Sequence, residues 1–294
     1  MEHLEDLPFR QFNLALPSRG PGEVAVLDFG RLDAPVAGVF LHANGFNART
    51  YRRLLGPVSR FNRILAFDQR GHGATTLETR PEGRRDWLDL RDDLLAFIAV
   101  LDLKEVALCG HSMGGTVSLL AAREAPDRIH RLLLLDPVMP PSVLANGGDA
   151  SPMVAAAIRR RATFASRADA RAAYLGRGAF ATWPEAMLED YVEGGFRDAP
   201  DGAVELACAP SWEASNYYAA QGHDSWGALE AYPGPVRILA AETGSTCRES
   251  PGFDLGELAP RVSLTRAPGT THFLPMERPD LVMNNLAETL LADL

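Results

Sequence analysis

Short apolar runs alternate with longer amphipathic stretches along most of this chain. Buried strands of parallel sheets are nearly continuous apolar runs, whereas surface helices carry apolar residues at every third or fourth position. The pattern predicts strands at 35–43, 62–69, 106–110, 129–137, 235–242 and 261–267, preceded by a hairpin of two strands at 11–17 and 23–30. It predicts helices at 48–55, 84–103, 116–126, around 255–259 and from 279 to 294. This alternation indicates an α/β protein with a mostly parallel eight-stranded sheet and helices on both faces.

The alternation stops in one long segment, residues 138–226. This segment is rich in Ala and Arg, has no convincing buried strand, and begins with the proline-rich linker PVMPPSVLANGGDASP. We therefore expect an inserted, mostly helical cap between a first part of the core, residues 1–137, and a second part, residues 227–294. The arginine-rich run at 159–173 is interpreted as a solvated helix face.

Composition narrows the class of protein. The chain has 294 residues, 46% hydrophobic and 23% charged, which is ordinary for a globular protein. No apolar run is long enough to span a bilayer, so we expect no membrane partner. A formal net charge of −9 argues against nucleic-acid binding, which depends on Lys and Arg. Composition does not predict the oligomeric state.

The cysteines and the N-terminal residues bear on location. The three cysteines are an odd number, widely spaced and without a CxxC pair, so neither a disulfide framework nor a zinc site is indicated. The opening sequence MEHLEDLPFRQF carries acids and no apolar segment of the kind found in secretory signals. We expect a cytoplasmic protein that needs no metal and no cofactor.

The sequence Gly110-His111-Ser112-Met113-Gly114 fits the pattern G-x-S-x-G. It falls where a predicted strand ends and a predicted helix begins, which is the context that such a nucleophile turn requires. A sharp turn of this kind strains the serine backbone, and glycines two residues away on either side avoid clashes. The alternative interpretation is a glycine-rich turn in which Ser112 is only a helix N-cap.

Four stretches together resemble the α/β-hydrolase superfamily: HANGF (42–46), DQRGHG (68–73), GHSMGG (110–115) and THFLPMERP (271–279). The resemblance covers nearly the whole chain apart from the insertion. It implies that Ser112 is a nucleophile and that His272, in a turn after the last strand, is its general base. It also implies oxyanion-stabilising N–H groups at Met113 and Asn44.

The resemblance is imperfect at the oxyanion loop, because relatives begin this loop with His-Gly and this chain has H-A-N-G. The amides of Gly45 and Phe46 are therefore kept as alternatives to that of Asn44. Three other histidines in glycine-rich loops, His42, His72 and His111, are expected to make hydrogen bonds that join loops.

The acid of the expected triad departs from the usual pattern. Aligned on the strand at 235–242, the position where relatives carry Asp is Gly244. Asp136, at the end of the strand before the insertion, keeps the chain order nucleophile, acid, base. We favour Asp136; Glu242, at the end of its own strand, is the alternative acid, and Asp254 is a more remote one.

A serine with an imidazole base and two oxyanion amides performs acyl transfer without a cofactor. The sequence therefore predicts a serine hydrolase that acts on a small-molecule substrate with an acyl group, most simply a small carboxylic ester. A lactonase, a thioesterase or a carbon–carbon bond hydrolase would use the same triad, and a ligand-binding receptor or scaffold could share the fold. The insertion resembles a lid, and the candidate substrate-binding residues are Phe46, Phe273, Trp212 and Tyr217.

Overall fold

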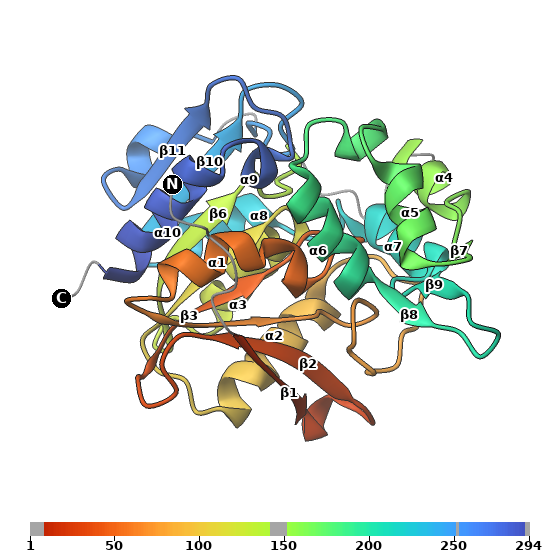
Figure 1. Ribbon diagram of the computed structural model, residues 1–294. Coiled ribbons are helices and arrows are strands. Elements are labelled where there is room, and N and C mark those ends of the chain that lie inside the picture. The colour runs from red at the N-terminus through yellow and green to blue at the C-terminus, as the bar shows by residue number, and fades with distance from the viewer. Residues whose placement is uncertain (1–8, 142–151, 251–252, 292–294) are drawn as a thin grey trace.

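The centre of the molecule is a twisted sheet flanked by helices (Figure 1). The structure is a computed structural model that describes residues 9–141, 152–250 and 253–291. The strands of this sheet lie in the order β1-β2-β4-β3-β5-β6-β10-β11. The pairs β1–β2 and β2–β4 are antiparallel, and all pairs from β4–β3 to β10–β11 are parallel. Their bounds are Phe9–Ala15 (β1), Glu23–Phe29 (β2), Val36–Leu41 (β3), Arg63–Phe67 (β4), Val106–His111 (β5), Ile129–Leu135 (β6), Val236–Ala241 (β10) and Val262–Ala267 (β11).

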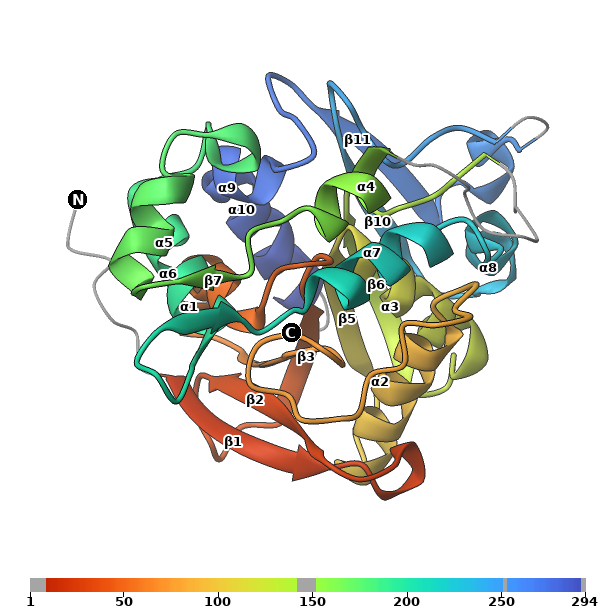
Figure 2. The ribbon, with the colours of Figure 1, turned by 90° about the vertical axis from the view of Figure 1, so that its right-hand side faces the viewer.

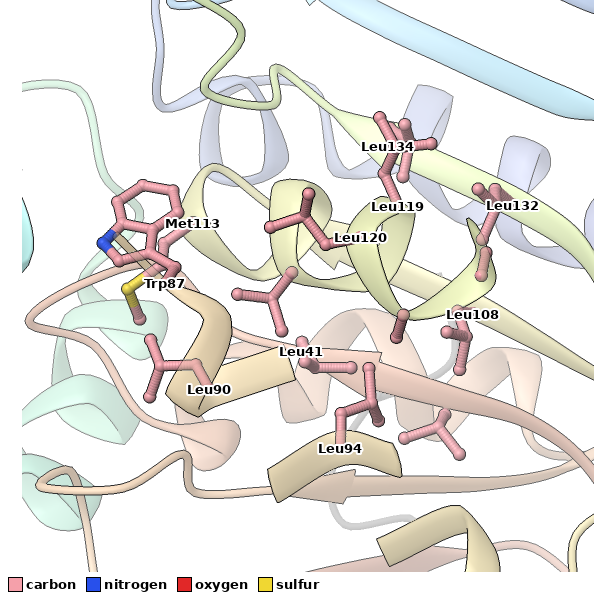
Figure 3. Close-up of a cluster of buried hydrophobic side chains, with 14 of the residues drawn as sticks. Leu41, Trp87, Leu90, Leu94, Leu108, Met113, Leu119, Leu120, Leu132 and Leu134 are labelled. Carbon is pink, nitrogen blue, oxygen red and sulfur yellow. The ribbon is translucent and has the colours of Figure 1, made fainter. Parts of the chain in front are cut away.

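The central strands are apolar on both faces, which is why helices cover both. Successive side chains of a strand point to opposite faces, so Leu108 joins one buried cluster and Cys109 the other. Figure 3 shows part of the first cluster, in which Leu134 of β6 lies near α3 (Met113–Glu124). Replacing one such buried leucine by alanine costs about 2–5 kcal/mol in general.

In the described residues, α2 (Leu88–Val100), α3 and α8 (Ser225–Ala231) lie on one side of the sheet, and α1 (Arg52–Val58) and α10 (Pro279–Leu291) lie on the other (Figure 2). On the first side α3 contacts both α2 and α8. On the second side α1 contacts α10. The predicted fold class, an α/β sheet with helices on both faces, is confirmed.

Each strand of the eight-stranded sheet overlaps a predicted strand, with ends that differ by at most two residues, and some helices differ more. The helix predicted at 84–103 is shorter, Leu88–Val100, and the side chains of Arg84 and Trp87 before it are hydrogen-bonded to Asn216. Two predicted helices contain 3-10 turns, η2 (Ala48–Tyr51, before α1) and η4 (Leu255–Leu258). The last helix ends at Leu291, and residues 292–294 lie outside the described part.

The segment predicted as a cap holds helices and also a small sheet. The helices are α4 (Pro152–Ile158), α5 (Arg167–Tyr174), η3 (Gly178–Phe180), α6 (Glu185–Gly195) and α7 (Pro210–Ala219). A three-stranded antiparallel sheet, which the sequence pattern does not predict, is formed by β7 (Thr163–Phe164), β9 (Val204–Leu206) and β8 (Phe196–Asp198). Strands of two or three residues are too short to give a periodic signal.

The limits predicted for the cap remain a prediction. Most of the proline-rich linker, residues 142–151, lies outside the described residues. The predicted end at residue 226 falls inside α8, and this helix packs against α3 of the core. Within the segment α4 packs on α7, and α6 packs on η2 of the core.

Candidate active site

The loops that follow the parallel strands meet at one edge of the sheet, where ligand sites of such sheets form. Ser112 directly follows β5, Asp136 directly follows β6, and His272 lies between β11 and the short helix α9 (Leu274–Glu277). The topology therefore brings together three side chains that are far apart in the sequence.

Ser112 has the strained backbone that the sequence motif predicts. Its φ of 55° and ψ of −119° lie outside the regions that L-residues favour. The glycines around it permit the turn: a Cβ on Gly110 would lie 2.4 Å from the Gly114 carbonyl carbon, and a Cβ on Gly114 would lie 2.3 Å from the Leu41 carbonyl oxygen. The turn thus depends on close backbone contact between α3, β5 and the loop after β3.

One hydrogen-bonded chain joins the three predicted residues. His272 Nε2 lies 3.0 Å from Ser112 Oγ, and His272 Nδ1 lies 2.6 Å from Asp136 Oδ2. The Ser112 residue is 6% exposed, whereas the imidazole of His272 is 24% exposed. The His272 side chain is therefore reachable from outside, whereas Ser112 is almost completely buried.

The Asp136 carboxylate is fully buried and has further donors. The backbone N–H of Ala241 and the hydroxyl of Ser245 donate to Oδ1, and the backbone N–H of Thr246 donates to Oδ2. Burial acts to raise the pKa of Asp136, but the hydrogen bonds from His272 and Ser245 and the charge of His272 outweigh it and bring the pKa to about 2. The carboxylate stays ionised at neutral pH.

The other two candidate acids lie elsewhere. Glu242 is exposed, and its carboxylate accepts the backbone N–H of Gly269. Asp254 is the N-cap of η4 and accepts the N–H of Gly256. Asp136 is thus the one of the three that is hydrogen-bonded to His272 in the described residues.

Two of the three candidate oxyanion amides in the loop after β3 already donate hydrogen bonds within the protein. Gly45 N–H donates to His72 Nε2 at 3.0 Å, and Phe46 N–H donates to the Ala43 carbonyl at 3.1 Å. In the described part of the chain the Asn44 N–H makes no such bond. Met113 is the first residue of α3, so its N–H has no acceptor within the helix.

Three buried histidines join the loops around the site. His42 lies 2.8 Å from the Ala43 carbonyl and accepts the Gln69 N–H at 2.9 Å. His72 Nδ1 lies 3.0 Å from the Arg70 carbonyl. His111 contacts the Tyr51 hydroxyl through Nδ1 and the backbone carbonyl of His272 through Nε2, at 2.7 and 2.8 Å.

Two of the predicted substrate-binding residues flank the triad. The rings of Phe46 and Phe273 are stacked with their centroids 6.4 Å apart, and both are partly buried. Phe46 lies 6.1 Å from the ring of His111, and Phe273 lies 5.8 Å from that of His272. Trp183, which the sequence analysis did not single out for the pocket, packs on Phe46 at 5.2 Å.

The other two predicted substrate-binding residues, Trp212 and Tyr217, belong to α7. Trp212 is 1% exposed, its Nε1 donates to the Arg70 carbonyl, and the guanidinium of Arg84 lies 4.0 Å from its ring centre. Tyr217 is partly buried, and burial together with the charge of Glu213 raises the pKa of its hydroxyl. The contact of both residues with a substrate stays a prediction.

Sequence reasoning missed the residues that hold this arrangement. Tyr51 comes from a helical turn with no motif, and Ser245 and Thr246 follow β10 at the position where only a missing acid was noted. The available signal was that polar side chains placed just after β10 would lie at the same sheet edge as Asp136. Among the described residues, no group of three or more His, Cys, Asp or Glu side chains could hold a metal ion.

Comparison with known proteins agrees with the fold. The sequence profile described as the Alpha/beta hydrolase family matches residues 39–284. The 2-(acetamidomethylene)succinate hydrolase of Mesorhizobium japonicum is 25% identical over 247 residues, which cover 83% of this chain and 84% of that one. The order of the strands, the strained turn at Ser112 and the profile together define an α/β hydrolase.

The chain belongs to the alpha/beta hydrolase family. The crystal structure of E-2-(acetamidomethylene)succinate hydrolase superimposes with a TM-score of 0.73 at 20% identity and covers 96% of this chain and 99% of that chain. The thioesterase domain from the curacin biosynthetic pathway gives 0.75 at 15% identity, covering 95% and 99%. These structures share the fold.

The family and its hydrolase members indicate a hydrolase with a small-molecule substrate. In the part of the chain that the structure describes, every helix is too short or too polar to cross a membrane.

Proposed function

We propose that this hydrolase cleaves a small carboxylic ester through an acyl-enzyme on Ser112, with His272 as general base and Asp136 as its partner. The observation that carries the proposal is the continuous chain of hydrogen bonds, 3.0 Å from Ser112 Oγ to His272 Nε2 and 2.6 Å from His272 Nδ1 to Asp136 Oδ2. This is the arrangement that makes a serine hydroxyl nucleophilic at neutral pH.

In the first half of the reaction, Ser112 Oγ attacks the ester carbonyl carbon and its proton passes to His272 Nε2. The carbonyl electron pair moves to the oxygen, and the N–H groups of Met113 and Asn44 stabilise the resulting oxyanion. When the electron pair returns, the bond to the alcohol oxygen breaks, and the proton on His272 passes to the leaving alkoxide. The products are an alcohol and an acyl-enzyme.

In the second half, water attacks the acyl carbon and gives a proton to His272. Collapse of the second tetrahedral intermediate breaks the bond to Ser112 Oγ, which takes the proton back, and the carboxylic acid leaves. Asp136 remains ionised throughout, because the pKa of its carboxyl is about 2. Its role is to hold the Nδ1 proton of His272 and to stabilise the imidazolium.

The surroundings of the triad support the rest of the proposal. Phe46 and Phe273 would form an apolar wall for the acyl group, and residues 138–226 would act as the cap over it. The cysteines Cys109, Cys208 and Cys247 are free and buried, which supports the proposed cytoplasmic location.

A panel of p-nitrophenyl esters, lactones, thioesters and 1,3-diketones tests the proposal. We expect turnover of short p-nitrophenyl esters, reduced at least about 10³-fold in Ser112→Ala. Ser118→Ala is the matched control: Ser118 lies in α3, the helix that Ser112 precedes, it is also buried, and its hydroxyl donates to the Gly114 carbonyl. If the protein prefers a lactone, a thioester or a diketone, that class replaces the ester as the proposed substrate. If it turns over none of these compounds, a ligand-binding receptor or scaffold is favoured.

A further inference from the structure

The side chain of Asn44 is held by helix α7. Asn44 Nδ2 donates to the backbone carbonyl of Glu213 at 3.0 Å, and Asn44 Oδ1 accepts from Asn216 Nδ2 at 2.9 Å. Both asparagines are buried, with 6% and 0% of their surface exposed. The residue proposed as an oxyanion donor is therefore fixed by a segment more than 160 residues later in the chain.

Arg84 determines the direction of this chain of hydrogen bonds. Its Nη1 donates to Asn216 Oδ1, and a guanidinium has no acceptor. Asn216 must then present its NH₂ to Asn44, and Asn44 must present its own NH₂ to the Glu213 carbonyl. The reverse orientation of either carboxamide would put two donors or two acceptors face to face.

Arg84, at the far end of this chain of hydrogen bonds, is itself held by other residues. The guanidinium of Arg84 lies over the ring of Trp212, and its Nη2 is 2.6 Å from Asp89 Oδ1. The backbone carbonyl of Asn216 accepts from Trp87 Nε1 at 3.0 Å. Asn216 is thus bonded to the 84–87 segment through both its side chain and its backbone.

We propose that Asn216 is a positioning residue for oxyanion stabilisation: with Arg84 it fixes the Asn44 side chain, and so the Asn44 peptide N–H, in the loop after β3. This inference rests on the proposed function. It means that docking of α7 on the 84–87 segment and formation of the oxyanion site are one structural event. Chemistry would therefore depend on α7 even where α7 touches no substrate.

The variant Asn216→Asp keeps the size of the side chain and its bond to Arg84 but removes the donor to Asn44. We expect kcat to fall about 10- to 100-fold, less than for deletion of an oxyanion donor, while KM changes less than about threefold. The inhibition constant of a trifluoromethyl ketone, whose adduct with serine is an oxyanion, should rise by the same factor as kcat/KM falls. A purely structural role would not produce this proportionality.

Ser215→Ala is the matched control, because Ser215 is the buried neighbour of Asn216 and its hydroxyl donates to the Trp212 carbonyl instead. It should leave kcat and the inhibition constant within about twofold. Arg84→Gln is the second variant, for use if Asn216→Asp does not fold. The glutamine side chain can still donate to Asn216, but it also carries an acceptor and therefore no longer fixes the orientation of the Asn216 carboxamide. We expect kcat to fall about 3- to 10-fold, with a parallel rise in the inhibition constant.

The outcomes separate the two proposals. If wild-type protein turns over esters but both variants keep its kcat and inhibition constant, or lose only thermal stability or KM, the positioning role is wrong and the proposed function stands. If wild-type protein is inert to esters and to the ketone, the proposed function itself fails.

Discussion

The ring of His111 is hydrogen-bonded to the backbone of His272, with 2.8 Å between His111 Nε2 and the His272 carbonyl oxygen. A carbonyl only accepts, so the proton of His111 is on Nε2, and Nδ1 accepts from the Tyr51 hydroxyl. The Tyr51 oxygen in turn accepts the Ala43 N–H at 3.2 Å. Burial and the nearby His272 lower the pKa of His111 to about 3, so the ring stays neutral and keeps this orientation.

Tyr51→Phe should therefore affect activity as well as stability. The variant leaves Ala43 N–H and His111 Nδ1 without their buried partner, which costs about 1–3 kcal/mol in the free energy of unfolding. It also loosens the loop that carries His272, so we expect kcat to fall about 3- to 10-fold. Urea unfolding and ester kinetics measure the two effects.

Tyr232→Phe is the control for Tyr51. Tyr232 is also fully buried, and its hydroxyl donates to the Ile129 carbonyl at 2.9 Å, at the start of β6 and away from the site. Tyr232→Phe should lose about as much free energy of unfolding as Tyr51→Phe but should keep the wild-type kcat. Equal kcat in both variants would show that the Tyr51–His111 pair does not position the base.

Asp136→Asn should reduce kcat by about 10³- to 10⁴-fold, because an amide cannot hold the Nδ1 proton of His272 in the reactive tautomer. Circular dichroism should show a folded protein. Glu242→Gln should retain wild-type kcat, since the Glu242 carboxylate bonds only to the Gly269 N–H in the described structure. Reversed results would assign the acid to Glu242.

His223 makes the protein sensitive to acid. In the described structure both of its ring nitrogens are buried without a hydrogen-bond partner, and burial lowers its pKa to about 4. The unfolded chain takes up this proton below about pH 6.5, whereas the native protein does not until about pH 4. This group therefore reduces stability progressively as the pH falls from 6.5 to 4.

His223→Phe removes that titration and keeps an aromatic ring in contact with Trp87, whose ring centre is 4.8 Å from that of His223. The stability lost between pH 7.5 and pH 4.5 should shrink by about 2–3 kcal/mol relative to wild type. Urea unfolding at the two pH values measures it. An unchanged pH dependence would mean that His223 is protonated equally in the native and unfolded protein.

Asp190 of α6 forms ion pairs with α1 of the core. Its carboxylate is 2% exposed, accepts from Arg52, and lies 2.8 Å from Arg53 Nε. Asp190→Ala leaves these arginines without their buried acid, so we expect a loss of about 3–5 kcal/mol in unfolding free energy.

Its neighbour Glu189 provides the control, because its side chain is 53% exposed and pairs with Arg171. Glu189→Ala should cost less than about 1 kcal/mol. Similar losses in the two variants would contradict the anchoring role of Asp190.

Local sequence signals predicted the core strands and the turn at Ser112, because a buried strand or a strained turn restricts the residues within a few positions. They favoured Asp136 but left Glu242 open as the acid, since both follow a strand at the same edge and only the fold brings Asp136 to His272. Asn216, Arg84 and Tyr51 had no signal at all, because their roles arise from contacts between distant segments. The small sheet was missed because its strands are so short.

In the proposed mechanism His272 makes Ser112 nucleophilic, and covalent labelling with a serine-directed probe measures this nucleophilicity. Wild-type protein incubated with a fluorophosphonate and analysed by intact and peptide mass spectrometry should gain one adduct per chain, on Ser112. Labelling should vanish in Ser112→Ala and fall sharply in His272→Ala. An unlabelled wild-type protein, or an adduct that persists in Ser112→Ala, would contradict the account.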